Sequence, residues 1–516
     1  MTSRLRLNEG NRRWWTLGAM CFALFMVMLD NTAVNVALPS IQKDLDATIA
    51  GLEWTVNAYT LSFAVLLVTG GRLGDIYGRR TVFLTGVVLF ACMSAFIGFS
   101  QSQTWLVVGR LLQGVGAALM MPGTLSIISN AFPPEERGKA IGTWAGVSGL
   151  ALAIGPLLGG FLVEHVSWQS IFFVNLPVAA LCVVVTLFAA QDTRDETVTR
   201  SIDVPGILTL TTGLASLVLA LVQANAWGWG SPRIIGLLVL AVAGLAGFAI
   251  VERRVRVPMV DFTFFRSRTF VGAALVAFTV TFAMLASFFF VTLYMQNILG
   301  FSPLEAGVRF LPTTVVIIAC GPLVGRLTDR IGPRVPLVTG LLLVAVSMFW
   351  QSRIDVDTDY GFLVGSFVLL GLGIGFVMSP MSTAAMNSVA REKAGVASGV
   401  LTMSRMVGGT FGVAVIGALV TTVGRAKIDE LLPSAPDAVR DRLTEGLGAG
   451  SVPVDATPQV VSAVREAFVS ALSIGLTVGT GVVLVSAGLA WALVGRVARA
   501  QPEPAPEAMP VPESVG

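Results

Sequence analysis

Ten residues decide the architecture: Gly71-Arg72-Leu73-Gly74-Asp75-Ile76-Tyr77-Gly78-Arg79-Arg80, which return as Gly325-Arg326-Leu327-Thr328-Asp329-Arg330-Ile331-Gly332-Pro333-Arg334. Six of the ten positions are identical at a constant offset of 254 residues. Each copy ends an apolar stretch long enough to form a membrane helix. Chance gives this rarely in a chain whose charges are so sparse, so the repeat predicts a duplicated membrane bundle. Secondary transporters build two rocking halves in this way.

The composition agrees with a membrane protein. The 516 residues are 54% hydrophobic and 13% charged, against about 25% charged in an ordinary soluble domain. A soluble protein could not hide so much apolar surface, so most of it must face lipid. The net charge of +3 gives no reason to expect a nucleic-acid partner. The four cysteines all lie inside apolar segments, which favours reduced packing residues over a metal site or a disulfide.

Apolar runs of about 20 residues mark the expected spans. We predict an all-α polytopic protein with fourteen of them. They cover residues 14–38, 52–73, 80–100, 104–129, 139–163, 169–190, 206–226, 232–252, 269–298, 303–327, 335–352, 360–385, 396–423 and 468–496.

The positive charges predict the orientation. The N-terminal tail, the loops after even-numbered spans and the C-terminal end hold 23 of the 34 Lys and Arg residues. By the positive-inside rule, both termini are cytoplasmic in a bacterial-type inner membrane.

The repeat sets the expected domains. It pairs the second span with the tenth, so two extra spans must lie between two six-helix halves. The predicted order is a tail (1–13), an N-terminal bundle (14–190), a linker with two helices and a basic interfacial segment (191–268), a C-terminal bundle (269–498) with an external, partly helical loop (424–467), and a disordered tail (499–516).

The repeated motif has a mechanical interpretation. Its glycines allow tight turns and close backbone approach. Asp75 and Asp329 end their helices at the cytoplasmic face, where a carboxylate can pair with arginine or cap a neighbouring helix. Such contacts would latch one conformation of a rocking transporter. The predicted latch residues are Gly71, Asp75, Gly78, Arg79, Arg80, Gly325, Asp329, Gly332 and Arg334.

Asp30 is the residue to single out, because it lies about fifteen residues into the first span. A carboxyl group inside the hydrocarbon is costly and is a functional hypothesis by default. When protonated it tolerates an apolar site, and when ionised it attracts a cation, so it can couple proton and substrate binding; the alternative is a purely structural carboxylate. Arg110 is its natural electrostatic partner, with Gln113 one turn away. Arg405 sits similarly in the second half and is a third candidate for proton coupling.

Further motifs follow one another along the chain. They are Leu29-Asp-Asn-Thr-Ala-Val-Asn-Val-Ala-Leu-Pro39, Arg110-Leu-Leu-Gln-Gly-Val-Gly116, Gly146 through Gly155-Pro-Leu-Leu-Gly-Gly160, Trp168 through Pro177, and Ala397-Ser-Gly399 through Arg405. With the first copy of the repeat, they resemble the 14-helix drug:proton antiporters of the major facilitator superfamily. The resemblance implies the major facilitator fold, a proton-coupling role for Arg110, and an antiporter motif made by Gly146, Gly155, Pro156, Gly159 and Gly160.

A substrate path needs a mixed apolar and polar lining, and Met and Phe side chains adapt to varied ligands. Besides Asp30 and Gln113, we take as candidates Asn35, Trp54, Asn57, Tyr59, Phe288, Phe289, Tyr294, Gln296, Met378, Met381 and Asn387.

Enzyme chemistry finds no support. Gly146-Val-Ser148-Gly149 looks like an intramembrane protease motif, but His165 would lie about 25 Å from Ser148 along one helix. There is no Gly-x-x-x-x-Gly-Lys-Ser/Thr nucleotide loop, so an ion gradient must drive the protein. We expect a monomer without cofactors that meets protons, membrane lipids and an amphiphilic substrate. The expected function is drug export by proton antiport; the alternatives are export of an endogenous lipid or secondary metabolite, and a receptor or channel.

Overall fold

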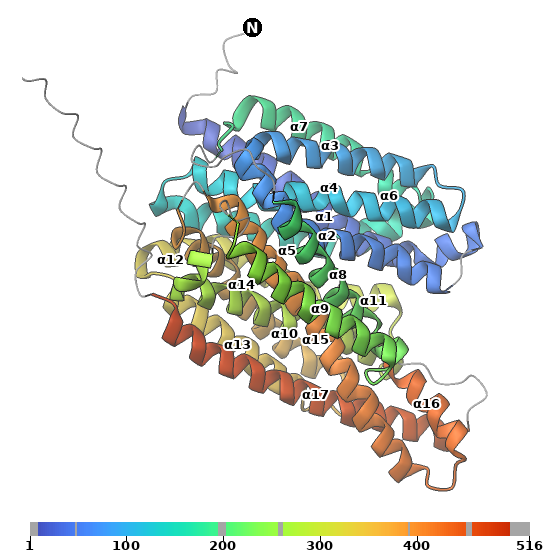
Figure 1. Ribbon diagram of the computed structural model, residues 1–516. Helices are drawn as coiled ribbons and strands as arrows, with labels where there is room; N and C mark the ends of the chain where they lie inside the picture. Colours follow the sequence, from blue (N-terminus) through green and yellow to red (C-terminus); the bar gives the residue numbers. More distant parts are fainter. Residues whose placement is uncertain are drawn as a thin grey trace, which may run out of the picture.

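A computed structural model describes residues 9–46, 49–194, 203–255, 262–390, 393–449 and 457–495. This part of the chain is almost wholly helical, as predicted, and its long helices run roughly alongside one another (Figure 1). The helices are α1 (Glu9–Leu45), α2 (Ile49–Tyr77), α3 (Arg79–Gly98), α4 (Gln103–Ala131), α5 (Pro134–His165), α6 (Ser170–Phe173), α7 (Asn175–Ala189), α8 (Val204–Trp227), α9 (Pro232–Glu252), the 3₁₀ turn η1 (Phe262–Arg266), α10 (Arg268–Asn297), α11 (Pro303–Arg309), α12 (Leu311–Ile331), α13 (Arg334–Gln351), α14 (Tyr360–Asn387), α15 (Ala394–Leu431), α16 (Asp437–Ala449) and α17 (Pro458–Leu493).

Thirteen stretches of the described chain are helical, long and apolar enough to cross a membrane. One of them combines α6 and α7. Helix α5 is not among the thirteen, but it has 32 residues and packs within the bundle (Figure 1). Together they agree with the fourteen predicted spans.

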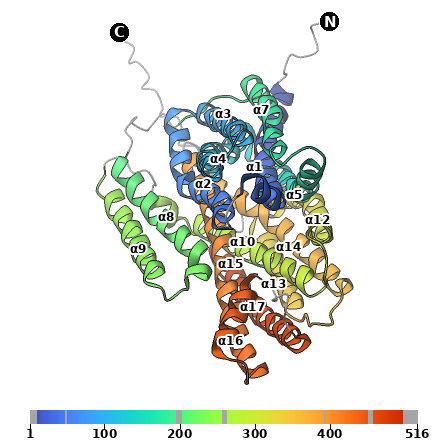
Figure 2. The same cartoon turned by 90° about the vertical axis from the view of Figure 1, so that its right-hand side faces the viewer.

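The helices form two groups and a separate pair. Helices α1 to α7 pack together, and α10 to α17 form the second group (Figure 1). Helices α8 and α9 stand at one side, and α8 lies against α2 of the first group and α15 of the second (Figure 2). The two groups meet along α2 with α15 and along α5 with α12.

Two predicted spans are interrupted, both at prolines. The span predicted over 303–327 is split into α11 and α12, and α12 has Pro312 in its first turn. The span predicted over 169–190 is split into α6 and α7, and Pro177 lies in the first turn of α7. Proline has no N–H to donate to the preceding turn, so it suits the start of a helix.

The boundaries around the predicted external loop also differ. Helices α15 and α17 extend into the range 424–467, and α16 fills much of what remains between them. Apolar residues explain this, since Ile428, Leu447 and Val464 are buried. At the other boundaries, α1 already begins at Glu9. The basic segment 253–268 is described only in part, and the predicted tail 499–516 lies outside the described residues.

Both copies of the repeat lie at one end of the bundle, called the motif end below. The described chain also begins and ends there. Arg13 in the first turns of α1 pairs with Glu136 at the start of α5, at 2.9 Å. Arg334 of the second copy donates a hydrogen bond from Nε to the Val494 carbonyl, at the close of α17.

Candidate functional site

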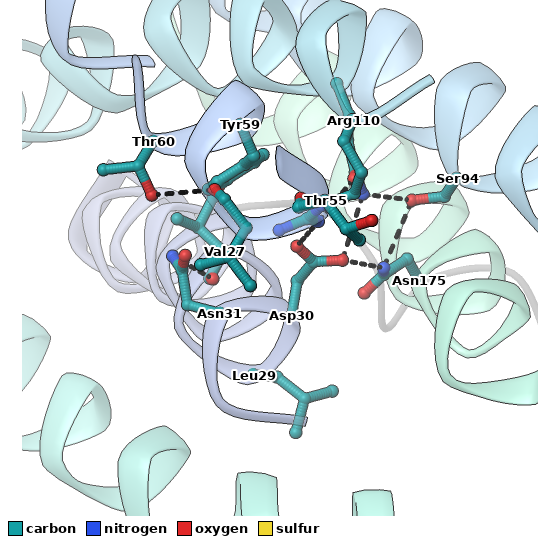
Figure 3. Close-up of polar contacts among 12 residues, drawn as sticks. Val27, Leu29, Asp30, Asn31, Thr55, Tyr59, Thr60, Ser94, Arg110 and Asn175 are labelled. Carbon is teal, nitrogen blue, oxygen red and sulfur yellow. Dashed lines mark hydrogen bonds and ion pairs between the residues drawn. The ribbon is translucent and has the colours of Figure 1, made fainter. Parts of the chain in front are cut away.

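A buried ion pair lies inside the first group of helices. Asp30 on α1 is 1% exposed, and its Oδ2 accepts a hydrogen bond of 2.5 Å from Nη1 of Arg110 on α4 (Figure 3). Its Oδ1 accepts from Nε2 of Gln113 at 3.0 Å and from Nδ2 of Asn175 at 3.3 Å. Three donors therefore satisfy the carboxylate in a place without bulk water.

Arg110 is held as firmly as its partner. Its Nε donates to the Thr55 carbonyl on α2 at 3.0 Å, and Nη1 also donates to Oε1 of Gln113 at 2.8 Å. The guanidinium carbon lies 4.2 Å from the ring centroid of Tyr59, within range of a cation–π contact. Arg110 lies on α4 and bonds groups on α1 and α2, so a change in the charge of Asp30 would change the forces on all three helices.

Two members of this cluster were not singled out from the sequence. Ser94 on α3 accepts hydrogen bonds from Gln113 at 2.8 Å and from Asn175 at 3.2 Å. Asn175 lies within the motif Trp168 through Pro177, where its polar side chain amid apolar residues was a usable signal. Ser94 had no such signal, because small hydroxyl residues are common in membrane helices.

The first copy of the repeat binds the N-terminus of a helix from the other group. Asp75 on α2 is 1% exposed and accepts from the backbone N–H groups of Gly395 at 3.0 Å and Val396 at 2.9 Å, at the start of α15. Arg79 pairs with the same carboxylate at 2.8 Å. The carboxylate thus caps free donors and faces the positive end of the helix dipole.

The second copy does the same on the opposite diagonal. Asp329 on α12 accepts from the N–H groups of Gly138 at 3.0 Å and Lys139 at 3.2 Å, near the start of α5. The position that corresponds to Arg79 is Pro333, so the two copies differ in their arginine partner. We call the two carboxylate–helix contacts the latch.

The terminal arginines of both copies hold helix ends. Arg80 donates from Nη1 to the carbonyl of Ala190, at the close of α7, at 3.2 Å. Arg334 bonds the equivalent place in the second group, the carbonyl at the close of α17. Before them, Gly78 and Gly332 have φ angles of 105° and 81°, which favour glycine at these turns.

Glycines let the two groups touch at the latch. A Cβ added to Gly71 would overlap the backbone of Gly395, and one added to Gly325 would overlap the backbone of Gly138. The obstacle is main chain in each case, so no rotamer change would relieve it. The motif end is therefore closed in this structure.

The predicted antiporter motif joins α5 to α1. A Cβ on Gly155 would overlap the hydroxyl of Thr32, and one on Gly159 would press on Ala33. Gly146 has only ordinary contacts with α12. No tight contact of Gly160 is described, and the Pro156 side chain lies outside the described residues.

The predicted substrate residues do not gather in one place. Tyr59 and Gln113 belong to the ion-pair cluster. The hydroxyl of Tyr294 donates to the carbonyls of Asp355 and Thr358 in the α13–α14 loop, at 2.7 and 2.9 Å. Asn387 accepts from Arg137 at 2.7 Å near the motif end. We therefore leave Tyr294 and Asn387 out of the proposed substrate site.

The remaining candidates have less specific surroundings. Phe288 packs on Phe310 with ring centroids 4.8 Å apart. Of the others, Met381 is buried, Phe289 is 45% exposed, and the Asn35 side chain lies outside the described residues. Trp54, Asn57, Gln296 and Met378 are partly buried.

Arg405, the third predicted coupling residue, is not in the Asp30 cluster. Its Nη1 lies 4.0 Å from Sδ of Met378, and its guanidinium carbon lies 5.7 Å from the ring centroid of Trp144.

Comparisons with known proteins agree with this architecture. Residues 20–413 match the Major Facilitator Superfamily. The chain is 40% identical to the tetracenomycin C resistance and export protein of Streptomyces glaucescens, over 98% of this chain and 95% of that protein. It is 36% identical to a puromycin resistance protein of Streptomyces alboniger, over 94% and 92%, and 32% identical to a multidrug transporter protein of Bacillus subtilis, over 82% and 78%.

Solved structures share the fold. A proton:xylose symporter of the same superfamily superposes with a TM-score of 0.62 at 13% identity, covering 96% of this chain and 98% of the other. A human organic anion transporter gives 0.58 at 15% identity, covering 93% and 99%.

Proposed function

Because this chain belongs to the Major Facilitator Superfamily, we propose that it is a proton-coupled antiporter that exports hydrophobic or amphiphilic drugs across the cytoplasmic membrane. It is a transporter and not an enzyme. The names of its relatives mention export, resistance and multidrug transport, which favours a drug over an endogenous lipid as the cargo. The observation that carries the proton-coupling part is the buried pair of Asp30 and Arg110.

The proposed coupling begins at Asp30. When a proton neutralises this carboxylate, Arg110 loses its only described counter-charge and keeps the acceptors on Thr55 and Gln113. Breaking a buried pair costs about 3–5 kcal/mol. A shift of about 5.5 kcal/mol turns a 1:99 population into 99:1. The free-energy change on protonation of Asp30 is therefore large enough to change which conformational state is favoured.

Helix α5 offers a route from this site to the latch. Thr32, two residues after Asp30, is in tight contact with Gly155 on α5. The other end of α5 is bound by Asp329. A displacement of α1 would move α5 as a packed rod and strain the contact at Asp329. In the proposed orientation the motif end is cytoplasmic, so the structure is closed inside, in the state that would receive the external proton.

Transport by inverted membrane vesicles tests the proposal. The vesicles are acidified inside, and accumulation of ethidium and of 9-anthracenecarboxylate is followed before and after an uncoupler. We expect uncoupler-sensitive accumulation of at least one dye by the wild type and its loss in Asp30→Asn. Asp357→Asn removes an exposed acid of the α13–α14 loop and serves as the matched control.

Uncoupler-sensitive transport that persists in Asp30→Asn would move proton coupling to another residue. Accumulation of neither dye by the wild type would contradict drug export and favour a lipid or a dedicated metabolite as the cargo.

A further inference from the structure

Arg405 differs from Arg110 in having no acidic partner in the part of the chain that the structure describes. No carboxylate lies within 4.0 Å of it among the described residues, and its side chain is only partly buried. It lies ten residues after Gly395, the residue bound by Asp75, which is about 15 Å along α15. Arg405 is therefore beyond the reach of the latch and deep within the span.

The sequences of the three helices that carry Arg405, Met378 and Trp144 supply no acid at this depth. Helix α14 contains no Asp or Glu, and the acids of α15 and α5 all stand in their terminal turns. A guanidinium stays ionised, and holding it unpaired among apolar groups is costly. A charge placed there without a counter-ion among the described residues indicates a counter-ion that arrives from outside the chain.

A second donor lies at the same place. Trp144 is 2% exposed, and its indole N–H has no hydrogen-bond partner among the residues described. The Arg405 guanidinium stands 5.7 Å from its ring centroid. A buried donor without an acceptor is unfavourable. An oxygen that accepts hydrogen bonds would therefore satisfy the Trp144 indole N–H and, if it carried a negative charge, would also supply the missing counter-charge of Arg405.

The two donors come from opposite groups of helices. Trp144 is on α5 and Arg405 is on α15, so a ligand bound to both would lie between the groups. Met378 of α14 adds a thioether beside the guanidinium. A tryptophan ring and a flexible Met side chain suit a flat, apolar body of variable shape.

We propose that Arg405 and Trp144 bind an ionised oxygen, a phenolate or carboxylate, of an aromatic amphiphilic cargo. The guanidinium supplies the counter-charge and a fork of donors, the indole N–H adds one more, and the aromatic body packs on Trp144 and Met378. This inference names a cargo class for the proposed exporter and rests on that function. It separates the roles of the two arginines that lie deep within the spans, since Arg110 serves the proton site and Arg405 serves the cargo.

A matched pair of probes tests the charge preference. The full chain in lipid nanodiscs is dialysed against 9-anthracenecarboxylate or its neutral analogue 9-anthracenemethanol, and binding to empty nanodiscs is subtracted. We expect the wild type to prefer the carboxylate. Arg405→Gln should weaken carboxylate binding at least tenfold, which corresponds to about 1.4 kcal/mol, and leave the alcohol unchanged. Arg405→Lys should retain part of the preference, and Trp144→Phe should lose a smaller part.

Arg233 provides the control. It also lies over a tryptophan ring, 5.6 Å from the centroid of Trp227, but it is exposed and belongs to the α8–α9 pair. Arg233→Gln should not change the binding of either probe.

Equal binding of the two probes by the wild type would overturn the inference, and so would an unchanged preference in Arg405→Gln or an equal loss of both probes. The vesicle assay separates this from the proposed function. Uncoupler-sensitive ethidium export without any carboxylate preference would contradict the cargo site at Arg405 and leave the proposed antiport intact. Carboxylate preference without proton-coupled transport would contradict antiport and leave the cargo site intact.

Discussion

Gly71→Ala should open the motif end. The added methyl group would overlap the carbonyl group of Gly395. This carbonyl group belongs to the main chain of α15, so it cannot move aside without moving the helix. The overlap can be relieved only by moving α2 away from α15, where Asp75 binds the first N–H groups of α15. The substitution therefore raises the free energy of the closed state and does not affect a state in which α2 and α15 are separated.

The size of the effect follows from known overpacking costs. Inserting a methyl group into a well-packed contact costs about 1–3 kcal/mol. A difference of that size changes an equilibrium about 5–150-fold. The fraction of molecules closed at the motif end should fall by this factor relative to the open fraction.

Spin-label distances can measure the shift. Tyr77 and Ile331 occupy equivalent positions in the two copies of the repeat and are 48% and 46% exposed, so they accept labels after the native cysteines are replaced. Gly18→Ala is the matched control, because a Cβ there meets nothing within 4 Å. We expect Gly71→Ala to add a population at longer distance and Gly18→Ala to match the parent. Identical distance distributions for Gly71→Ala and the parent would refute this account of the latch.

Three further predictions concern stability, transport and pH. Arg110→Gln leaves Asp30 buried without its counter-charge and should lower stability by about 3–5 kcal/mol, seen as a lower Tm in detergent; an unchanged Tm would contradict the burial argument. Asn175→Ala removes one of three donors to Asp30 and should slow uncoupler-sensitive transport about tenfold or less, so complete loss would mean a larger role for Asn175. Hydrogen bonds from the backbone N–H and side chain of Ser302 hold the pKa of Glu305 below its ordinary value. The capping of α11 by ionised Glu305 therefore stabilises the fold at a pH above the ordinary pKa of Glu, and this stabilisation is lost as the pH falls through the lowered pKa of Glu305. In an NMR titration, Ser302→Ala should raise the pKa of Glu305. An unchanged pKa would contradict the contribution of the Ser302 side chain.

The parts of the fold predicted from the sequence were those that rest on composition and repetition. Apolar runs marked the helices because lipid leaves few alternatives to a helix. Asp30 and Arg110 stood out because charges are rare inside such runs, and the structure brings them together. Helix interruptions were missed, because a proline inside an apolar run can mark either a kink or a new start.

The partners of the latch were beyond sequence reasoning for a physical reason. Asp75 binds backbone N–H groups of residues that lie 320 and 321 positions away, and a backbone donor has no residue-type signature. Arg405 shows a different limit. An arginine within a membrane span indicates a function, but only its surroundings show that it lies apart from Asp30.

Proton release on drug binding tests the central claim most directly. The purified protein is placed in weakly buffered detergent solution near its operating pH, and a dye that it exports is added while a pH indicator is followed. If cargo and proton compete through Asp30, the wild type should release protons on dye binding and Asp30→Asn should bind the dye without releasing any. Equal release by the wild type and Asp30→Asn would contradict the account and place the exchangeable proton elsewhere.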